Sequence, residues 1–116
     1  MSIQNPLFAP PSEWVCPECI DYKGQSPVAI DLETYDPGIK DHGPGWATGN
    51  GKVVGVALAW EGFKGYFPID HDAPGNYDKK VFLRQFQDLL DRCPEIVCHN
   101  AMYDIGWMKR MGMRIT

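Results

Sequence analysis

The sequence predicts an α/β fold with one mixed sheet, built in the order three antiparallel strands, a helix, a parallel strand and a second helix. Apolar stretches of strand length come first in the chain. Apolar residues at helical spacing follow, and a short apolar stretch then precedes a second helical pattern. With 116 residues, of which 44% are hydrophobic and 22% charged, the chain has the composition of one small globular domain.

The first half of the chain predicts an arm and three strands. Residues 1–27 hold five of the ten prolines and little periodicity, which indicates an extended arm. An apolar run before the first acid predicts a buried strand over 28–34. Residues 35–51 are rich in Gly, Pro, Asp and Asn and predict a loop, which ends in a hairpin-type Asn50-Gly51. Two further strands are expected over 52–60 and 63–69, joined by a turn.

The second half predicts two helices around a short strand. Asp78 is a good N-cap for a helix that ends at Cys93-Pro94, and its apolar face is formed by Val81, Phe82, Phe86, Leu89 and Leu90. A fourth strand is expected over 95–100. A second helix over 102–111 follows, with Gly112 as its C-cap.

Composition narrows the classes of function. The formal net charge of −4 argues against a protein that grips nucleic acid by electrostatics alone, although it does not exclude an enzyme that meets phosphates through metal ions. The longest apolar run, 53–60, is far too short to span a membrane, and the N-terminus lacks the pattern of a signal peptide. We therefore expect a cytoplasmic protein with reduced thiols and no membrane partner.

Asp31 and Glu33 form the first candidate site. Residues two apart on a strand point to the same face, and two close carboxylates repel each other unless a divalent cation relieves the repulsion. Asp70 and Asp72 have the same spacing, but they lie in a Pro/Gly loop where acids cost little. The apolar residues before Asp31 favour the first pair. The alternative is a solvated strand end whose acids face water.

Asp104 forms the second candidate site, together with Asn100 and Tyr103. These residues directly follow the fourth strand, which is expected to lie parallel to the first. The carboxyl ends of both strands then open on one edge of the sheet, where ligands bind in open α/β sheets. The alternative is an acid that is favoured by the helix N-terminus, which would explain Asp104 but not Asn100 and Tyr103.

The two motifs resemble those of a known superfamily. The sequence from Ile30 to Thr34, Ile-Asp-Leu-Glu-Thr, is similar to the first motif of DEDD-superfamily 3′–5′ exonucleases. The sequence from Asn100 to Asp104, Asn-Ala-Met-Tyr-Asp, is similar to the second. The likeness is strongest to the proofreading domain of bacteriophage family A DNA polymerases. It implies a ribonuclease-H-like fold and a partial exonuclease domain over residues 28–116, after an arm of residues 1–27, which would act in host cytoplasm if phage-encoded.

The resemblance also implies a chemistry. Two divalent cations, Mg²⁺ or Mn²⁺, would support hydrolysis at the 3′ end of single-stranded DNA and release nucleoside 5′-monophosphates. Asp31 would bridge both ions, Glu33 would bind the first and help orient water, and Asp104 would hold the second. The positions that match the pocket of the terminal nucleotide are Thr34, Asn100 and Tyr103. Tyr103 is equally well explained as a core aromatic residue that fixes the helix.

The sequence departs from the family pattern in its third motif. Its third motif, Tyr-x-x-x-Asp or His-x-x-x-x-Asp, is missing because no Asp, Glu, His or Tyr follows Asp104. We therefore expect a fold truncated at the C-terminus, and little or no nuclease activity from these 116 residues alone. A polymerase domain could follow in a longer chain. The alternatives are an RNA-trimming exonuclease of the same superfamily and a non-catalytic module of the same fold that binds nucleic acid or protein.

Other cysteines and histidines carry weaker signals. Cys16 and Cys19 have the spacing of half a zinc knuckle, and a tetrahedral site needs two more ligands. We expect His42 and His71 to be solvated in polar loops. For His99, packing beside the site is favoured over metal ligation.

Overall fold

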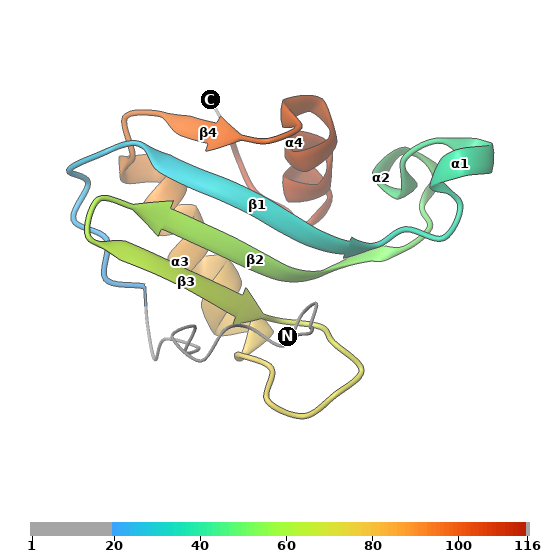
Figure 1. The fold of residues 1–116 in the computed structure, drawn as a ribbon, viewed down its shortest axis with the longest axis horizontal. Coiled ribbons are helices and arrows are strands. Elements are labelled where there is room, and N and C mark those ends of the chain that lie inside the picture. Colours follow the sequence, from blue (N-terminus) through green and yellow to red (C-terminus); the bar gives the residue numbers. More distant parts are fainter. Residues whose placement is uncertain (1–19, 116) are drawn as a thin grey trace.

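A computed structural model describes residues 20–115 as a four-stranded mixed sheet with its two longer helices on one face (Figure 1). The strand order is β3-β2-β1-β4, in which β1 pairs antiparallel with β2 and parallel with β4. The α/β class and the predicted order of strands and helices are therefore confirmed. The elements are β1 (Val28–Tyr35), α1 (Ile39–His42), α2 (Gly45–Thr48), β2 (Lys52–Trp60), β3 (Phe63–Pro68), α3 (Lys79–Arg92), β4 (Ile96–Cys98) and α4 (Ala101–Arg110).

The connection between β1 and β2 differs from the prediction. Residues 35–51 were expected to form a loop, but they contain the short helices α1 and α2, which lie beyond the carboxyl end of β1 (Figure 1). Asn50 and Gly51 do not join the strands by a tight hairpin. Gly51 has φ +87°, and a Cβ there would lie 2.2 Å from the Tyr35 carbonyl oxygen. Glycine is required because the chain passes so close to the end of β1.

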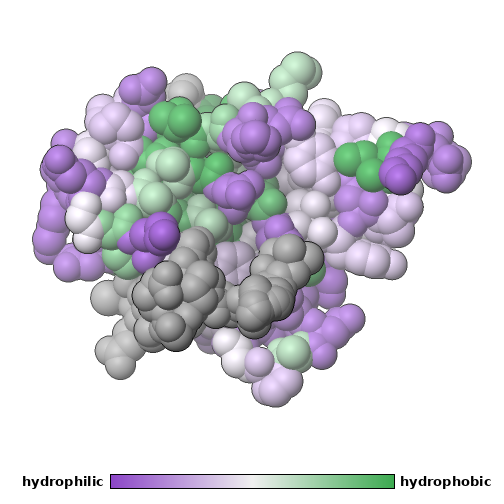
Figure 2. All heavy atoms as spheres, in the orientation of Figure 1, coloured by the Kyte–Doolittle hydropathy of each residue, from purple (hydrophilic) through white to green (hydrophobic). Residues whose placement is uncertain are grey.

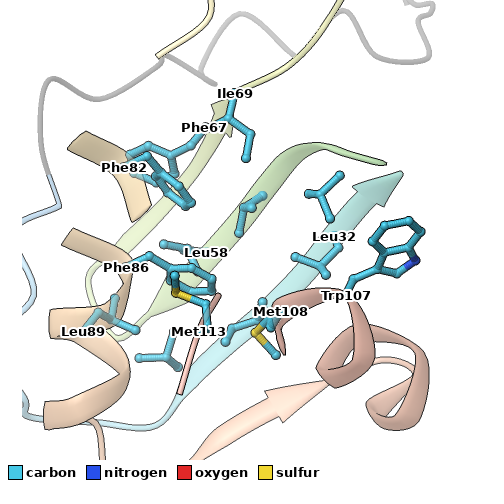
Figure 3. Packing of buried hydrophobic residues seen from close by; sticks show 14 of the residues in the cluster. Leu32, Leu58, Phe67, Ile69, Phe82, Phe86, Leu89, Trp107, Met108 and Met113 are labelled. Atoms are coloured by element: carbon cyan, nitrogen blue, oxygen red, sulfur yellow. The ribbon is translucent and has the colours of Figure 1, made fainter. Parts of the chain in front are cut away.

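The hydrophobic core lies between one face of the sheet and the helices α3 and α4 (Figure 3). Alternation along β1 buries Val28, Ile30 and Leu32 on this face. Helical spacing on α3 buries Phe82, Phe86 and Leu89, and α4 adds Trp107 and Met108. Burying one such side chain stabilises the fold by about 1.5–3 kcal/mol. These residues therefore determine which face of the sheet packs against α3 and α4.

Both predicted helix caps are present. The Asp78 carboxylate accepts a hydrogen bond from the Val81 amide at 3.1 Å, which fixes the start of α3. At the end of α4, Gly112 has φ +95° and donates to the Lys109 carbonyl, while the Met113 amide donates to the Met108 carbonyl at 3.0 Å. This pair of bonds is a Schellman motif, and it turns the chain so that Met113 is buried in the core.

The described part of the predicted arm packs on the core. Tyr22 is only 2% exposed, and its ring meets the edge of Trp60 with centroids 5.1 Å apart. The Arg92 guanidinium lies 5.6 Å from the centre of the same tyrosine ring. The compact unit therefore includes residues before the predicted boundary at 28. Cys16 and Cys19, with the zinc hypothesis, lie outside the described residues.

A β-bulge interrupts the pairing of β1 with β2. Glu33 pairs with Gly55 while Thr34 pairs with Val53, which leaves Val54 as an extra residue in β2. The Val54 carbonyl accepts hydrogen bonds from the amides of both Ile69 and Asp70, at 2.9 and 3.0 Å. The bulge therefore fixes the direction in which the chain leaves β3.

The second face of β1 is open among the residues that the structure describes. Ala29 and Asp31 are exposed on it and Glu33 is half-buried, so the strand predicted to be buried is interior in the sheet but, within residues 20–115, covered on one face. Figure 2 shows an apolar area on this face over β4, β1 and β2, with hydrophilic residues around it. None of the helices over residues 20–115 is long and apolar enough to cross a membrane.

Candidate carboxylate site

Asp31 and Glu33 project from the open face of β1, as their spacing predicts. Asp31 is exposed and Glu33 is half-buried. Within residues 20–115, neither carboxylate has a Lys, Arg or His partner at ion-pair distance. Two neighbouring negative charges therefore stand on rigid backbone without a cation to balance them.

The second pair of acids, Asp70 and Asp72, has cationic partners instead. Asp70 is bridged by Lys52 and Lys79, each at 3.3 Å, and Asp72 lies 3.9 Å from Lys52. Although partial burial acts in the opposite direction, hydrogen bonds from the two lysines hold the pKa of Asp70 below its usual value. Among the residues that the structure describes, the pair on β1 therefore has no cationic partner, whereas Asp70 and Asp72 do.

Asp104 lies in the first turn of α4 and is 3% exposed. One of its carboxylate oxygens accepts a hydrogen bond from the Asn100 amide at 3.3 Å. This bond is what the helix N-terminus interpretation of Asp104 requires. Burial raises the pKa of Asp104, and repulsion from Asp31 raises it further, which indicates that the two carboxylates lie near each other.

Asp31 acts on both of the other predicted acids. Burial raises the pKa of Glu33, and the Asp31 charge adds to the rise, as it does for Asp104. Burial also raises the pKa of the Cys98 thiol, with Asp104 and Asp31 as the next causes. The Asp31 charge therefore acts on Glu33, Asp104 and Cys98, and the pairing of Ile30 with Cys98 places β4 beside Asp31.

The donor set fits a hard divalent cation in chemistry but is not assembled into a metal centre. Three carboxylates are the oxygen ligands that Mg²⁺ and Mn²⁺ prefer. Over residues 20–115, however, no three His, Cys, Asp or Glu side chains converge closely enough to hold an ion. An ion would therefore have to draw Asp31, Glu33 and Asp104 together.

Thr34 and Tyr103, predicted to line a nucleotide pocket, contact each other. The Thr34 and Tyr103 hydroxyls are 2.9 Å apart, and Tyr103 donates to the Asp36 carboxylate at 2.8 Å. The same Asp36 oxygen accepts from the Gly45 amide at 3.1 Å. This arrangement supports the alternative in which Tyr103 fixes the helix, because its hydroxyl joins α4 to the β1–β2 connection. Asn100 is exposed just before α4, and its side chain does not cap the helix.

Sequence reasoning missed Asp36 and Tyr66, and it gave His71 no part in the site. Asp36 follows the first motif in a loop, where no periodicity marks it. Tyr66 could have been found, because the strand register pairs Asp31 with Ala57 and Ala57 with Tyr66, all on one face. The expectation that His71 is solvated is wrong, since it is half-buried and its Nε2 lies 2.7 Å from the Tyr66 hydroxyl.

A groove of about 370 Å³ runs along the open face from Asp31 toward the start of β1. Its floor is made of small side chains, Ala29, Ala57 and Ala59, and His99 lines it near Asp31. The expected packing of His99 is wrong, because this side chain is exposed. The site is therefore a carboxylate cluster at the end of a shallow apolar groove.

The fold and site define an α/β protein in which two acids on an interior strand of a mixed sheet have no cationic partner within residues 20–115. Comparison with known proteins adds a relative: a DNA-directed DNA polymerase of Pseudomonas phage M6 is 40% identical over 120 residues. The match covers 96% of this chain and 18% of the polymerase, so the chain spans less than a fifth of that protein's length. No family model matches the chain, and no solved structure matches it.

Proposed function

We propose that this chain is part of a 3′–5′ exonuclease of DNA, of the proofreading type, with a ribonuclease-H-like fold. The observation that carries the proposal is the position of Asp31, which shares the open face of β1 with Glu33, lies just beyond the pairing of β1 with β4, and has no cationic partner among the described residues. Unbalanced acids on rigid strands and helix termini are typical of metal-dependent sites. The similarity to part of a phage DNA polymerase supports DNA as the substrate.

Asp31, Glu33 and Asp104 would hold two divalent cations, Mg²⁺ or Mn²⁺. When bound, such ions activate water and stabilise the oxygen that leaves the phosphorus. Asp31 would contact both ions, because it neighbours the other two acids. Glu33 would help orient water on the open face. Asn100, exposed beside Asp104, would be available to the terminal nucleotide of a single-stranded 3′ end, whereas Thr34 and Tyr103 would shape the wall behind it.

Metal binding tests the proposal directly. Calorimetric titration of the 116-residue chain with Mn²⁺ is expected to give saturable binding that Asp31→Ala abolishes. Asp70→Ala is the matched control, because Asp70 has the same spacing to a second acid but is balanced by Lys52 and Lys79. Saturable binding that survives Asp31→Ala and disappears in Asp70→Ala would overturn the assignment of the site.

Activity of the isolated chain is a separate matter. With the third motif missing, we expect little or no release of nucleoside 5′-monophosphates from 3′-labelled single-stranded DNA in Mg²⁺ or Mn²⁺. Robust turnover that Asp31→Ala abolishes would contradict this expectation. Parallel assays with single-stranded RNA distinguish an RNA-trimming enzyme, which would degrade RNA in preference.

A non-catalytic module is the second candidate. Two observations favour it: the three acids do not converge on a metal position within residues 20–115, and Asp104 is already engaged by the Asn100 amide. Such a module would bind single-stranded DNA or a protein partner, such as a polymerase domain, equally well with or without divalent ions. Binding of a fluorescent oligonucleotide that EDTA leaves unchanged, in a chain that takes up no Mn²⁺, would favour the module.

A further inference from the structure

Tyr66 lies on the open face of the sheet, the face that also carries Asp31 and Glu33. Its cross-strand partner is Ala57, which in turn pairs with Asp31. The tyrosine does not stand upright over Ala57 but leans over Gly55. A Cβ on Gly55 would lie 1.8 Å from the Tyr66 hydroxyl oxygen. Gly55 is the partner of Glu33 across β1 and β2, so the hydroxyl is carried to the neighbourhood of the Glu33 carboxylate.

Gly55 makes this placement possible. With any side chain at position 55, the Tyr66 ring and hydroxyl could not occupy the space above it, because the ring carbons would also lie within 2.3–2.8 Å of the new Cβ. The charges agree with the geometry: burial raises the pKa of the Tyr66 hydroxyl, and the Glu33 carboxylate raises it further. The Glu33 charge therefore acts on the Tyr66 hydroxyl across the two strands.

His71 holds the hydroxyl from the other side. Its Nε2 lies 2.7 Å from the Tyr66 oxygen. The His71 backbone is fixed by Asn76, which accepts from the His71 amide and donates to the His71 carbonyl, both at 3.0 Å. The two residues before His71, Ile69 and Asp70, both donate their amides to the carbonyl of the bulge residue Val54. The imidazole is thus placed by backbone contacts, as a group that orients another side chain must be.

We propose that Tyr66 is a positioning residue for Glu33, oriented by His71. In this arrangement the Nε2–H of His71 donates to the Tyr66 oxygen, and the Tyr66 O–H donates to the Glu33 carboxylate. Glu33 has no ion pair within the described residues, so this donor would fix its orientation. The proposal rests on the proposed function, because the orientation of Glu33 matters when the carboxylate binds an ion.

The experiment measures Mn²⁺ affinity by calorimetry in the 116-residue chain. Tyr66→Phe keeps the ring over Gly55 and removes only the hydroxyl. We expect it to weaken Mn²⁺ binding about tenfold or more, the loss typical for groups that orient metal ligands, with little change in Tm. Tyr77→Phe is the matched control: it removes a hydroxyl that donates to Gln85 at 2.7 Å, on the helix side of the molecule, and should leave the affinity unchanged.

The direction of the His71 bond is tested by a second pair of variants. His71→Gln places an amide N–H near the position of Nε2 and should retain the affinity of the original chain. His71→Leu removes the donor and should weaken Mn²⁺ binding as Tyr66→Phe does. This rescue by the conservative variant separates orientation from simple packing, and it decides the matter if Tyr66→Phe fails to fold.

The outcomes separate the two proposals. If Tyr66→Phe and His71→Leu bind Mn²⁺ as tightly as the original chain while Asp31→Ala does not bind it, the positioning role is wrong and the metal site stands. If the original chain takes up no Mn²⁺, the proposed function and the role of Tyr66 both fall. If the affinities of the Tyr66, Tyr77 and His71 variants all fall in proportion to their Tm, the pair serves only to hold the fold, and the positioning role is again wrong.

Discussion

The indole ring of Trp46 lies directly against the backbone of Gly106. A Cβ on Gly106 would be 2.3 Å from Cε2 and 2.4 Å from Cδ2 of the ring, distances that real atoms do not adopt. The contact joins α2, in the β1–β2 connection, to α4. Because Asp104 lies two residues before Gly106, the helix that carries this acid is fixed in part by the tryptophan.

We predict that Gly106→Ala destabilises the protein by about 1–3 kcal/mol, the usual cost of forcing extra atoms into a packed site. This is opposite in sign to helix propensity, which favours alanine over glycine by about 1 kcal/mol in a helix interior. Urea unfolding followed by circular dichroism measures the change. A Gly106→Ala variant at least as stable as the original chain would show that the ring does not occupy this space.

A second variant isolates the contact. In a Trp46→Ala background the ring is absent, so Gly106→Ala should become neutral or stabilising. The double-mutant cycle should therefore give a coupling of about 1–3 kcal/mol between positions 46 and 106. Additive effects would mean that the loss at Gly106 has another cause.

The Tyr103 hydroxyl should contribute to stability through the β1–β2 connection. Tyr103→Phe removes bonds to both Thr34 and Asp36, and it leaves the Asp36 carboxylate with fewer donors. Loss of a partner of a buried polar group costs about 1–3 kcal/mol. Hydrogen exchange should show the Gly45 amide, which donates to the same Asp36 oxygen, exchanging faster in the variant. Unchanged exchange at Gly45 would contradict the link.

Asp104 should make stability fall as pH rises. Since burial and Asp31 raise the pKa of Asp104, the folded state binds its proton more tightly than the unfolded chain does. The stability from this group is therefore complete below the ordinary pKa of an aspartate and is lost as pH rises through the raised value. Each unit of elevation corresponds to about 1.4 kcal/mol.

The variant Asp104→Asn should thus have a higher Tm than the original chain at pH 7, with a difference that shrinks toward pH 3. The side-chain oxygen of the asparagine can still accept the bond from the Asn100 amide, so the helix start is kept. Asp41→Asn, at an exposed position of α1, is the control for removing one carboxylate elsewhere in the protein. A lower Tm of Asp104→Asn at pH 7 would contradict the sign.

Tyr22 should be part of the folding unit. Its side chain is nearly fully buried against Trp60, so Tyr22→Ala should cost about 3–5 kcal/mol, as for other large aromatic core residues. Tyr22→Phe, which keeps the ring and loses the hydroxyl bond to the Ser26 carbonyl, should cost about 1 kcal/mol. A small loss in Tyr22→Ala would place the start of the domain after this residue.

The parts of the fold that could be predicted are those set by local periodicity. The apolar residues of α3 recur at helical spacing, Asp78 caps it, and Gly112 ends α4, so these limits follow from the sequence. The face shared by Asp31 and Glu33 follows from the two-residue period of a strand. The position of Asp104 near Asp31 follows from the parallel pairing of β1 and β4.

The rest depends on contacts between residues that are distant in the chain. Asp36 and Tyr103 are 67 residues apart in the chain. No local sequence pattern predicts the contact between Trp46 and Gly106, which come from separate segments. The sequence also does not show that one face of β1 is open. Val28, Ile30 and Leu32 would be apolar in an interior strand whether one face or both faces were covered. The contact of His71 with the Tyr66 hydroxyl depends on the direction in which the chain leaves β3, which no local pattern around His71 predicts.

The bulge at Val54 makes the length of β2 matter as much as its composition. Before it, from Trp60 back to Val56, even-numbered residues face the core; beyond it, the core-facing residue is the odd-numbered Val53, which is 3% exposed. Deleting one valine from this run would remove the bulge and leave a regular strand whose remaining valine still faces the core opposite Thr34, but the carbonyl that accepts from the Ile69 and Asp70 amides would be lost. Relatives of this protein that lack the extra residue should therefore keep the same core and differ in the path that the chain takes after β3.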